Sequence, residues 1–205
     1  MTRIGLLGGS FNPAHRGHRA ISLSAIGALT LDEVWWLVSP GNPLKAVEGM
    51  APLAARLASA AAMAQDAPIR ASDLETELGT RYTVDTLRAI IARFPRDRFV
   101  WLMGADNLAQ FDKWHDWRGI AATVPIAVIA RPGYDDDALA APAMGWLRRY
   151  QRPVSQAKDW TEWSVPALVL LRFRPNPTSA TQLRAADPAW YRRFAGPHAT
   201  SETQE

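Results

Sequence analysis

The sequence contains no cysteine and only four histidines among its 205 residues. Without cysteine no disulfide framework can form, which is consistent with a reducing compartment. A structural zinc site needs about four Cys, His or carboxylate ligands. Only two histidines, His15 and His18, stand close together in the sequence, and two ligands are too few. We therefore expect no metal site built from the protein's own side chains.

Long apolar runs are also missing. Gly8 and Gly9 interrupt the first apolar stretch, so the N-terminus lacks the apolar region of a signal peptide. The Ala-rich stretch 51–64 contains Arg56, and it is too short and too weakly apolar to cross a bilayer. We expect a cytoplasmic protein with no membrane partner.

The charge imbalance is small. A formal net charge of +3 suits anionic substrates but is too weak to indicate a nucleic-acid partner. Hydrophobic residues make up 48% of the chain and charged residues 21%, which is ordinary for a globular protein. The length predicts one domain over residues 1–195, and the polar residues 196–205 indicate a disordered tail. The sequence leaves self-association as a homo-oligomer open.

Apolar runs of strand length alternate with segments of helical periodicity. The predicted strands are residues 3–7, 34–38, 99–103, 125–130 and 167–171, with a short extended piece at 68–71. The predicted helices are residues 20–29, 53–64, 83–94, 114–120, 138–150 and 179–186. Residues 151–165 show no clear pattern. This alternation predicts an α/β fold with a doubly wound parallel sheet covered on both faces.

The loop G-G-S-F-N-P-A-H-R-G-H, residues 8–18, follows the first strand and opens the first helix. Its two glycines allow a tight turn and close approach to a ligand. The N–H groups of a helix N-terminus attract anions, and His15 and His18 fall on neighbouring positions of that turn. Either imidazole can donate an N–H to a phosphate oxygen. The loop therefore predicts a polyphosphate site, although a helix start with two solvated histidines is the alternative. The spacing fits neither the dinucleotide fingerprint nor the P-loop.

In such a sheet, ligands bind at the carboxyl ends of the strands, near the switch point of the strand order. The other loops of interest follow the strands that end near Val38, Met103 and Leu171. We therefore expect them to form one pocket together with the first loop.

Residues 8–18 resemble the G-G-[ST]-F-[DN]-P-x-H-x-G-H signature of the nucleotidylyltransferases, whose core is Rossmann-like. Asn12 stands where many members carry Asp. The resemblance implies that the first four residues of the loop bind ATP: Gly8, Gly9, Ser10 and Phe11. It also implies catalytic roles for His15 at the attacked α-phosphate and for His18 at the β- and γ-phosphates.

Two further segments resemble substrate-binding elements of the same family. Lys45 ends a P-x-K element that helps to bind substrate phosphates, with Leu44 in place of the common His. A solvated surface lysine is the alternative. Residues 82–87, Y-T-V-D-T-L, resemble an element that lines the pyridine mononucleotide pocket. This implies mononucleotide contacts for Tyr82, Thr83 and Thr86, while the pattern alone also predicts Thr83 as a helix N-cap.

One later segment and the tryptophan that follows it extend the resemblance. Residues 104–107, G-A-D-N, resemble the G-A-D-x element beside the adenosine ribose and the pyridine ring, which assigns Gly104 and Asp106 to ATP and Asn107 to the mononucleotide. A plain turn with Asp106 as N-cap is the alternative. Trp114 matches the tryptophan that stacks on the nicotinate ring, and His115 stands where relatives often have Tyr.

Residues 178–184, T-S-A-T-Q-L-R, resemble the element that binds the β- and γ-phosphates of ATP, with Thr178 in place of Ile or Val. Ser179 is a predicted N-cap, and a guanidinium at 184 could bind two phosphate oxygens at once. A capped helix with an exposed arginine is the alternative. The resemblance implies ATP contacts for Ser179, Thr181 and Arg184.

The five motifs span residues 4–184 in order and together are similar to the bacterial nicotinate-nucleotide adenylyltransferases. The implied reaction joins ATP and nicotinate mononucleotide into nicotinate adenine dinucleotide and pyrophosphate, a late step of NAD synthesis. Lys45 and Arg184 join the two histidines as implied catalytic residues, and Mg²⁺ is expected to arrive with ATP. Nicotinamide mononucleotide or, less readily, phosphopantetheine as acceptor, and a non-catalytic nucleotide-binding module, stay as alternatives.

Overall fold

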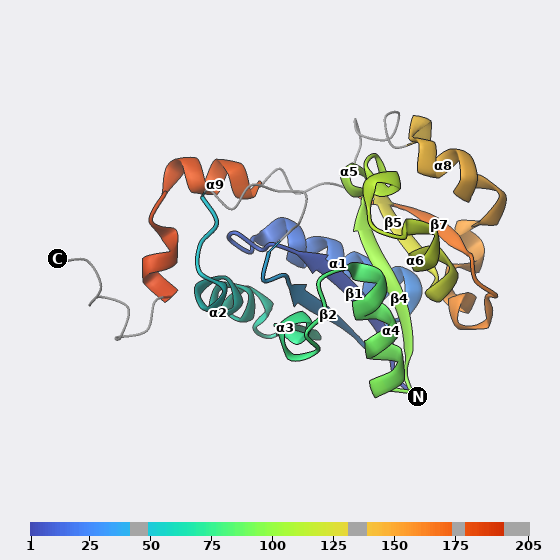
Figure 1. Cartoon of the computed structure of the whole chain (residues 1–205), viewed down its shortest axis with the longest axis horizontal. Coiled ribbons are helices and arrows are strands. Elements are labelled where there is room, and N and C mark those ends of the chain that lie inside the picture. The colour runs from blue at the N-terminus through green and yellow to red at the C-terminus, as the bar shows by residue number, and fades with distance from the viewer. Residues whose placement is uncertain (42–48, 131–138, 174–178, 195–205) are drawn as a thin grey trace.

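The computed structural model describes residues 1–41, 49–130, 139–173 and 179–194 (Figure 1). Its strands form one seven-stranded sheet in the order β3-β2-β1-β4-β5-β7-β6, and every neighbouring pair is parallel. The strands are β1 (Arg3–Gly9), β2 (Glu33–Val38), β3 (Ile69–Ser72), β4 (Arg98–Gly104), β5 (Ile126–Ala130), β6 (Gln151–Arg152) and β7 (Leu168–Arg172). The predicted Rossmann-like, doubly wound parallel sheet is confirmed.

Helices connect the strands and cover the sheet. The α-helices are α1 (Arg16–Leu29), α2 (Leu53–Ala64), α3 (Leu74–Glu77), α4 (Thr83–Arg93), α5 (Ala105–Leu108), α6 (Trp117–Thr123), α8 (Pro142–Leu147) and α9 (Ala180–Ala186). Four 3-10 helices are described: η1 (Phe111–Lys113), η2 (Arg148–Tyr150), η3 (Val154–Glu162) and η4 (Trp190–Phe194). η4 packs against α2, and in Figure 1 α9 and α2 lie at the end of the molecule opposite α8.

The strands are apolar on both faces because each face packs against helices. Side chains alternate along a strand, and in β4 Trp101 and Met103 face the cluster that contains the buried side chains of α4, α6 and α8. Val100 and Leu102 face the opposite cluster with α1, α2 and η3. This two-sided burial is why the strands read as continuous apolar runs.

The strand order reverses at β1. From β1 the chain builds outward through β2 and β3, then crosses to β4 on the other side of β1. The crevice of a doubly wound sheet opens at such a point, outside the carboxyl ends of the two central strands. The loops after β1 and β4 therefore flank one site.

Several element boundaries differ from the predicted ones. The helix predicted over 114–120 begins at Trp117, because the Asp116 carboxylate accepts the N–H of Gly119 and caps the helix there. The helix predicted over 138–150 begins at Pro142 and ends as a 3-10 turn. The predicted cap Thr83 is the first helical residue instead, and the N-cap is Tyr82, without a side-chain bond.

Residues 151–165, which had no predicted structure, contain β6 and η3. Trp160 is buried there and donates its indole N–H to the oxygen of Leu29 at the end of α1, 3.0 Å away. The segment covers one face of the sheet. Residues 196–205 lie outside the described residues, so the predicted tail and the single domain over 1–195 stay predictions.

None of the described helices is long and apolar enough to cross a lipid bilayer.

Candidate active site

A cavity of about 600 Å³ opens at the carboxyl ends of β1 and β4. That volume is within the usual range for small-molecule sites. Thirteen of the residues singled out in the sequence line it: Gly8, Gly9, Ser10, Phe11, His15, His18, Tyr82, Thr83, Gly104, Asp106, Asn107, Trp114 and Ser179. Segments that are far apart in the sequence thus meet in the one pocket that the sheet topology predicts.

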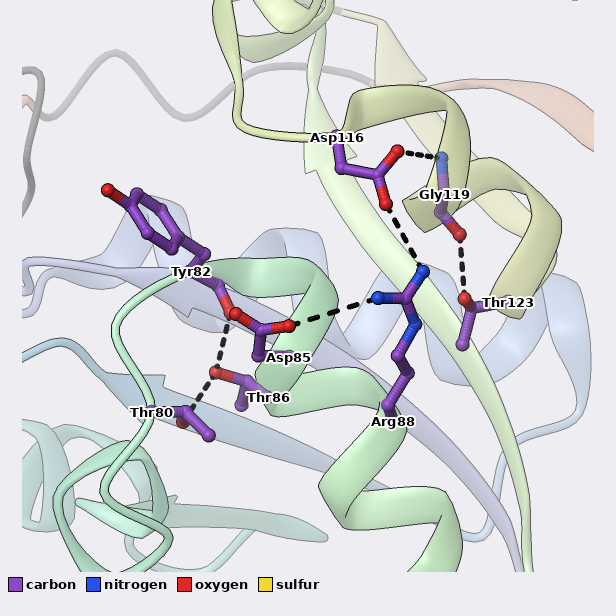
Figure 2. Close-up of polar contacts among 8 residues, drawn as sticks. All are labelled: Thr80, Tyr82, Asp85, Thr86, Arg88, Asp116, Gly119 and Thr123. Carbon is purple, nitrogen blue, oxygen red and sulfur yellow. Dashed lines mark hydrogen bonds and ion pairs between the residues drawn. The ribbon is translucent and has the colours of Figure 1, made fainter.

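The remaining candidate residues lie differently. Thr86 does not line the cavity: its hydroxyl is within hydrogen-bonding distance of the Thr80 hydroxyl, at 2.8 Å, and of the Tyr82 oxygen, at 3.2 Å, at the start of α4 (Figure 2). Arg184 and Thr181 are in α9, whose N-cap Ser179 lines the cavity. Lys45 lies outside the described residues.

The two histidines of the first loop hold each other in place at the start of α1. His15 is the N-cap, and its Nδ1 accepts the N–H of Gly17 at 3.1 Å. The Nδ1 atom of His18 accepts the N–H of His15 at 3.2 Å, and the ring centroids are 3.9 Å apart. Because Nδ1 is an acceptor in both rings, the neutral imidazoles carry their hydrogen on Nε2. Both rings line the cavity, and His15 is only 6% exposed, unlike a solvated cap.

Aromatic side chains pack against this first turn of α1. The Phe11 ring lies 4.8 Å from His18 and stacks on Trp36 at 5.1 Å, between centroids. Trp36 donates its indole N–H to Ser22, whose hydroxyl donates to the oxygen of His18. The orientation of the His18 ring is therefore set by packing as well as by the helix cap.

Asn12 joins the first loop to the segment before α2. Its side-chain Nδ2 donates to the oxygen of Gly49 at 3.0 Å, and its Oδ1 accepts the N–H of Ala51 at 3.2 Å. A carboxylate could accept the second bond but not donate the first. The amide of Asn12 thus has a local structural reason.

The wall formed by β4 depends on Gly8. A Cβ on Gly8 would lie 2.6 Å from the Trp101 ring, so glycine lets this tryptophan pack directly under the loop. Trp101 in turn meets Trp114 edge to face, with centroids 6.3 Å apart. The sequence marked Trp101 only as a core residue, but it also lines the cavity.

Tyr82 and His115 form a second aromatic wall. Their rings stack with centroids 4.2 Å apart, and both line the cavity. The next residue, Asp116, accepts a 3.1 Å bond from Arg88 of α4, which also approaches Asp85 at 3.9 Å (Figure 2). These contacts tie α4 to the start of α6 beside the ring pair.

Glu75 and Ser39 line the cavity and were missed from the sequence. Glu75 is 9% exposed, and burial raises the pKa of its carboxyl to about 7 against an opposing hydrogen bond from Ser39. Glu75 stands in an ordinary acidic stretch, so nothing in the local sequence marks it. Arg56, which the sequence noted only as a charge, is buried behind the first loop.

Within the described residues, no group of three or more His, Cys, Asp or Glu side chains is arranged to hold a metal ion.

A family model described as cytidylyltransferase-like matches residues 6–186. A relative from Erythrobacter litoralis, named a probable nicotinate-nucleotide adenylyltransferase, is 62% identical over 94% of this chain and 88% of its own. One from a Bradyrhizobium strain with the same name is 52% identical over 92% of this chain and 98% of its own.

The fold is similar to a solved structure of the Plasmodium falciparum nicotinic acid mononucleotide adenylyltransferase complexed with NaAD. The TM-score is 0.64 at 16% identity, over 90% of this chain and 83% of that one. At this identity the likeness supports the fold alone. Together with the family match and the relatives, it leads to one conclusion: the chain belongs to the cytidylyltransferase-like family and, within it, to the nicotinate-nucleotide adenylyltransferases.

Proposed function

We propose that this cavity binds ATP and nicotinate mononucleotide together and that the chain joins them into nicotinate adenine dinucleotide, releasing pyrophosphate. The observation that carries the proposal is that one cavity is lined by phosphate-binding groups and by groups suited to a pyridine ring. His15, His18 and Ser179 are of the first kind, and Tyr82 and Trp114 are of the second. A site for one nucleotide alone has no use for both sets.

The residues divide between the two substrates. On the ATP side, His15 would contact the α-phosphate, and His18, Lys45, Arg184 and the turn at Ser179 would hold the β- and γ-phosphates. Main-chain groups of the first loop, with Gly104, Asp106 and Thr181, complete the ATP contacts. On the mononucleotide side we place Lys45, Tyr82, Thr83, Asn107 and Trp114. Thr86, buried beneath this wall, holds the start of α4 rather than touching the substrate.

The chemistry needs positioning more than acid–base catalysis. A 5′-phosphate oxygen of the mononucleotide attacks the α-phosphorus of ATP, and the bond to the β-phosphate oxygen breaks as pyrophosphate leaves. The attacking oxygen is already an anion near neutral pH. The protein must align two anions that repel each other and stabilise the charge that moves onto pyrophosphate. Two Nε2–H donors and an arginine suit that task.

Mg²⁺ would enter with ATP. It neutralises phosphate charge and keeps mostly water and phosphate ligands, which fits a site whose described residues offer no carboxylate cage. The cytoplasmic setting expected from the sequence stays a prediction, as does self-association.

The direct test incubates the purified chain with ATP and one acceptor at a time and measures pyrophosphate release. We expect pyrophosphate and nicotinate adenine dinucleotide with nicotinate mononucleotide, and little turnover without an acceptor. A faster reaction with nicotinamide mononucleotide would move the proposal to that acceptor. No pyrophosphate with either acceptor would leave a nucleotide-binding module and contradict the proposal.

A further inference from the structure

Arg56 is a charged residue on the buried face of α2, where every other buried residue is small. The other buried positions of α2 are alanines and a serine: Ala55, Ser59, Ala60 and Ala64. The whole Arg56 residue is only 1% exposed, and its volume places it among the largest fully buried side chains. A buried guanidinium is costly unless its N–H groups are bonded. Its partners therefore indicate what it does.

The guanidinium joins the loop after β1 to both ends of the connection between β2 and α2, through their main-chain oxygens. Its Nη1 donates to Ser10 at 2.8 Å and to Ser39 at 2.7 Å, in the loops that follow β1 and β2. Its Nε donates to Ala51 at 2.8 Å, just before α2, and its Nη2 reaches Pro40 at 3.3 Å. Only the planar fork of arginine can serve so many acceptors at once.

These bonds act on peptide groups at the cavity. In a planar trans peptide the C=O and N–H point in opposite directions. When Arg56 holds the Ser10 oxygen, the N–H of Phe11 must therefore point away from the guanidinium. Phe11 has a φ of 45°, in the left-handed region that a non-glycine residue adopts only with outside support. The bond from Arg56 to the adjoining peptide supplies such support, and both Ser10 and Ser39 line the cavity.

The hydrogen bonds of Arg56 also leave its positive charge uncompensated. All four acceptors are neutral carbonyls, and among the described residues no carboxylate pairs with this side chain. A positive charge in a water-poor interior acts on nearby anions more strongly than one in solvent. The Arg56 guanidinium bonds the loop of residues 8–18, which would bind phosphates.

We propose that Arg56 is a positioning residue for the ATP triphosphate: it orients the Ser10 and Ser39 peptides at the cavity wall and adds a fixed positive charge behind them. This inference rests on the proposed function of the same cavity. It separates Arg56 from Arg184, whose side chain we expect to touch the phosphates directly.

A matched control is Arg19 of α1, whose side chain bonds the other end of α2. Arg19 donates from Nη1 to the oxygens of Met63 and Gln65, at 3.0 and 2.7 Å, and so joins α1 to the far end of α2. Its side chain too bonds main-chain carbonyls, but Arg19 does not line the cavity, and both acceptors lie at the end of α2. Arg19→Met therefore removes bonds of the same kind without touching the first loop.

The experiment compares Arg56→Met, Arg56→Lys and Arg19→Met in the full chain, by steady-state kinetics with each substrate varied and by thermal unfolding. For Arg56→Met we expect kcat/KM for ATP to fall on the order of 100-fold, the size of effect that a misplaced binding group causes. The KM for nicotinate mononucleotide should change little. Arg56→Lys keeps the charge but not the fork, so it should recover part of the loss. Arg19→Met should lower thermal stability without this ATP-specific effect.

Three outcomes would overturn the inference while leaving the proposed function intact. They are wild-type ATP kinetics in Arg56→Met, an equal loss for both substrates, and the same kinetic loss in Arg19→Met. If Arg56→Met does not fold, Arg56→Lys decides by the same split between ATP and mononucleotide parameters. A wild-type chain that releases no pyrophosphate would contradict the proposed function instead.

Discussion

Arg184 donates from Nη1 to the main-chain oxygen of Asn12 at 2.6 Å, although the two residues are 172 positions apart. Its Nη2 lies 3.4 Å from the hydroxyl of Thr181, one turn earlier on α9. This contact brings the last described α-helix against the first loop of the chain, the loop that carries the histidine pair. The two segments that we propose to bind phosphates thus lie against each other in one structure.

Replacing Arg184 should weaken ATP use. In Arg184→Lys the charge stays, but one amine cannot hold the Asn12 oxygen and a phosphate with the same geometry. Hydrogen bonds to charged groups contribute about 1.5–3 kcal/mol, so we expect kcat/KM for ATP to fall by roughly 10- to 100-fold. Steady-state kinetics with ATP varied measure this. Arg193→Met is the control, because Arg193 pairs at 2.9 Å with Asp187, near the end of the same C-terminal segment. Unchanged ATP kinetics in Arg184→Lys would remove Arg184 from the site.

Two substitutions of His18 test separately its hydrogen bond at the start of α1 and its proposed contact with the phosphates. His18→Ala should lower turnover by orders of magnitude while the fold stays intact. It also removes the capping-box bond that His18 accepts from the N–H of His15, at a cost of about 0.5–1.5 kcal/mol in the free energy of unfolding. Glutamine at this position of a capping box can bond the cap N–H again, so His18→Gln should regain stability but not turnover. Single-turnover rates and thermal unfolding measure the two effects. Near-normal turnover in either variant would show that His18 has no role in adenylyl transfer.

Removing the Asp116 cap should act on the mononucleotide side. Asp116→Ala removes the carboxylate that caps α6 at Gly119 (Figure 2), at a cost of about 0.5–2 kcal/mol in stability. It thereby frees the segment that holds His115 against Tyr82. We expect a raised KM for nicotinate mononucleotide and an unchanged KM for ATP. Arg88→Met leaves the cap intact and breaks the exposed ion pairs with Asp116 and Asp85, each worth less than about 1 kcal/mol. If both variants raise the two KM values alike, the ring pair does not belong to the mononucleotide site.

Glu75 should make the stability of the ligand-free protein depend on pH. Burial raises the pKa of its carboxyl in the folded state to about 7, from an ordinary value of 4.5. Between these pH values the folded state binds more protons than the unfolded state, so stability falls as pH rises through this window and then levels off. The loss approaches about 3 kcal/mol at pH 8, at 1.36 kcal/mol for each pKa unit.

Glu75→Gln keeps the shape of this side chain and removes its titration. Denaturant unfolding of both proteins from pH 4 to 8 should show the variant gaining on the wild type as pH rises. Parallel stability curves would mean that Glu75 titrates normally in the folded protein.

Much of the architecture followed from local patterns. The runs at 34–38 and 99–103 predict buried strands because a sheet covered on both faces needs apolar side chains at every position. The start of α6 at Trp117 was less accurate, because it depends on a cap that forms only when the Asp116 side chain folds back on the backbone.

By itself, the sequence determined the alternation of strands and helices and the motifs at the strand ends, because periodicity and turn residues act over a few positions. It also pointed to His15, His18 and Arg184 as candidate residues, because they belong to recognisable strings. Only the tertiary structure decided that Glu75 is buried at the cavity and Arg56 against the first loop. Arg56 bonds oxygens that are 5, 16, 17 and 46 positions away, and the burial that shifts the pKa of Glu75 exists only once the loops have come together. Contacts between distant segments leave no local pattern, so folding alone brings them about.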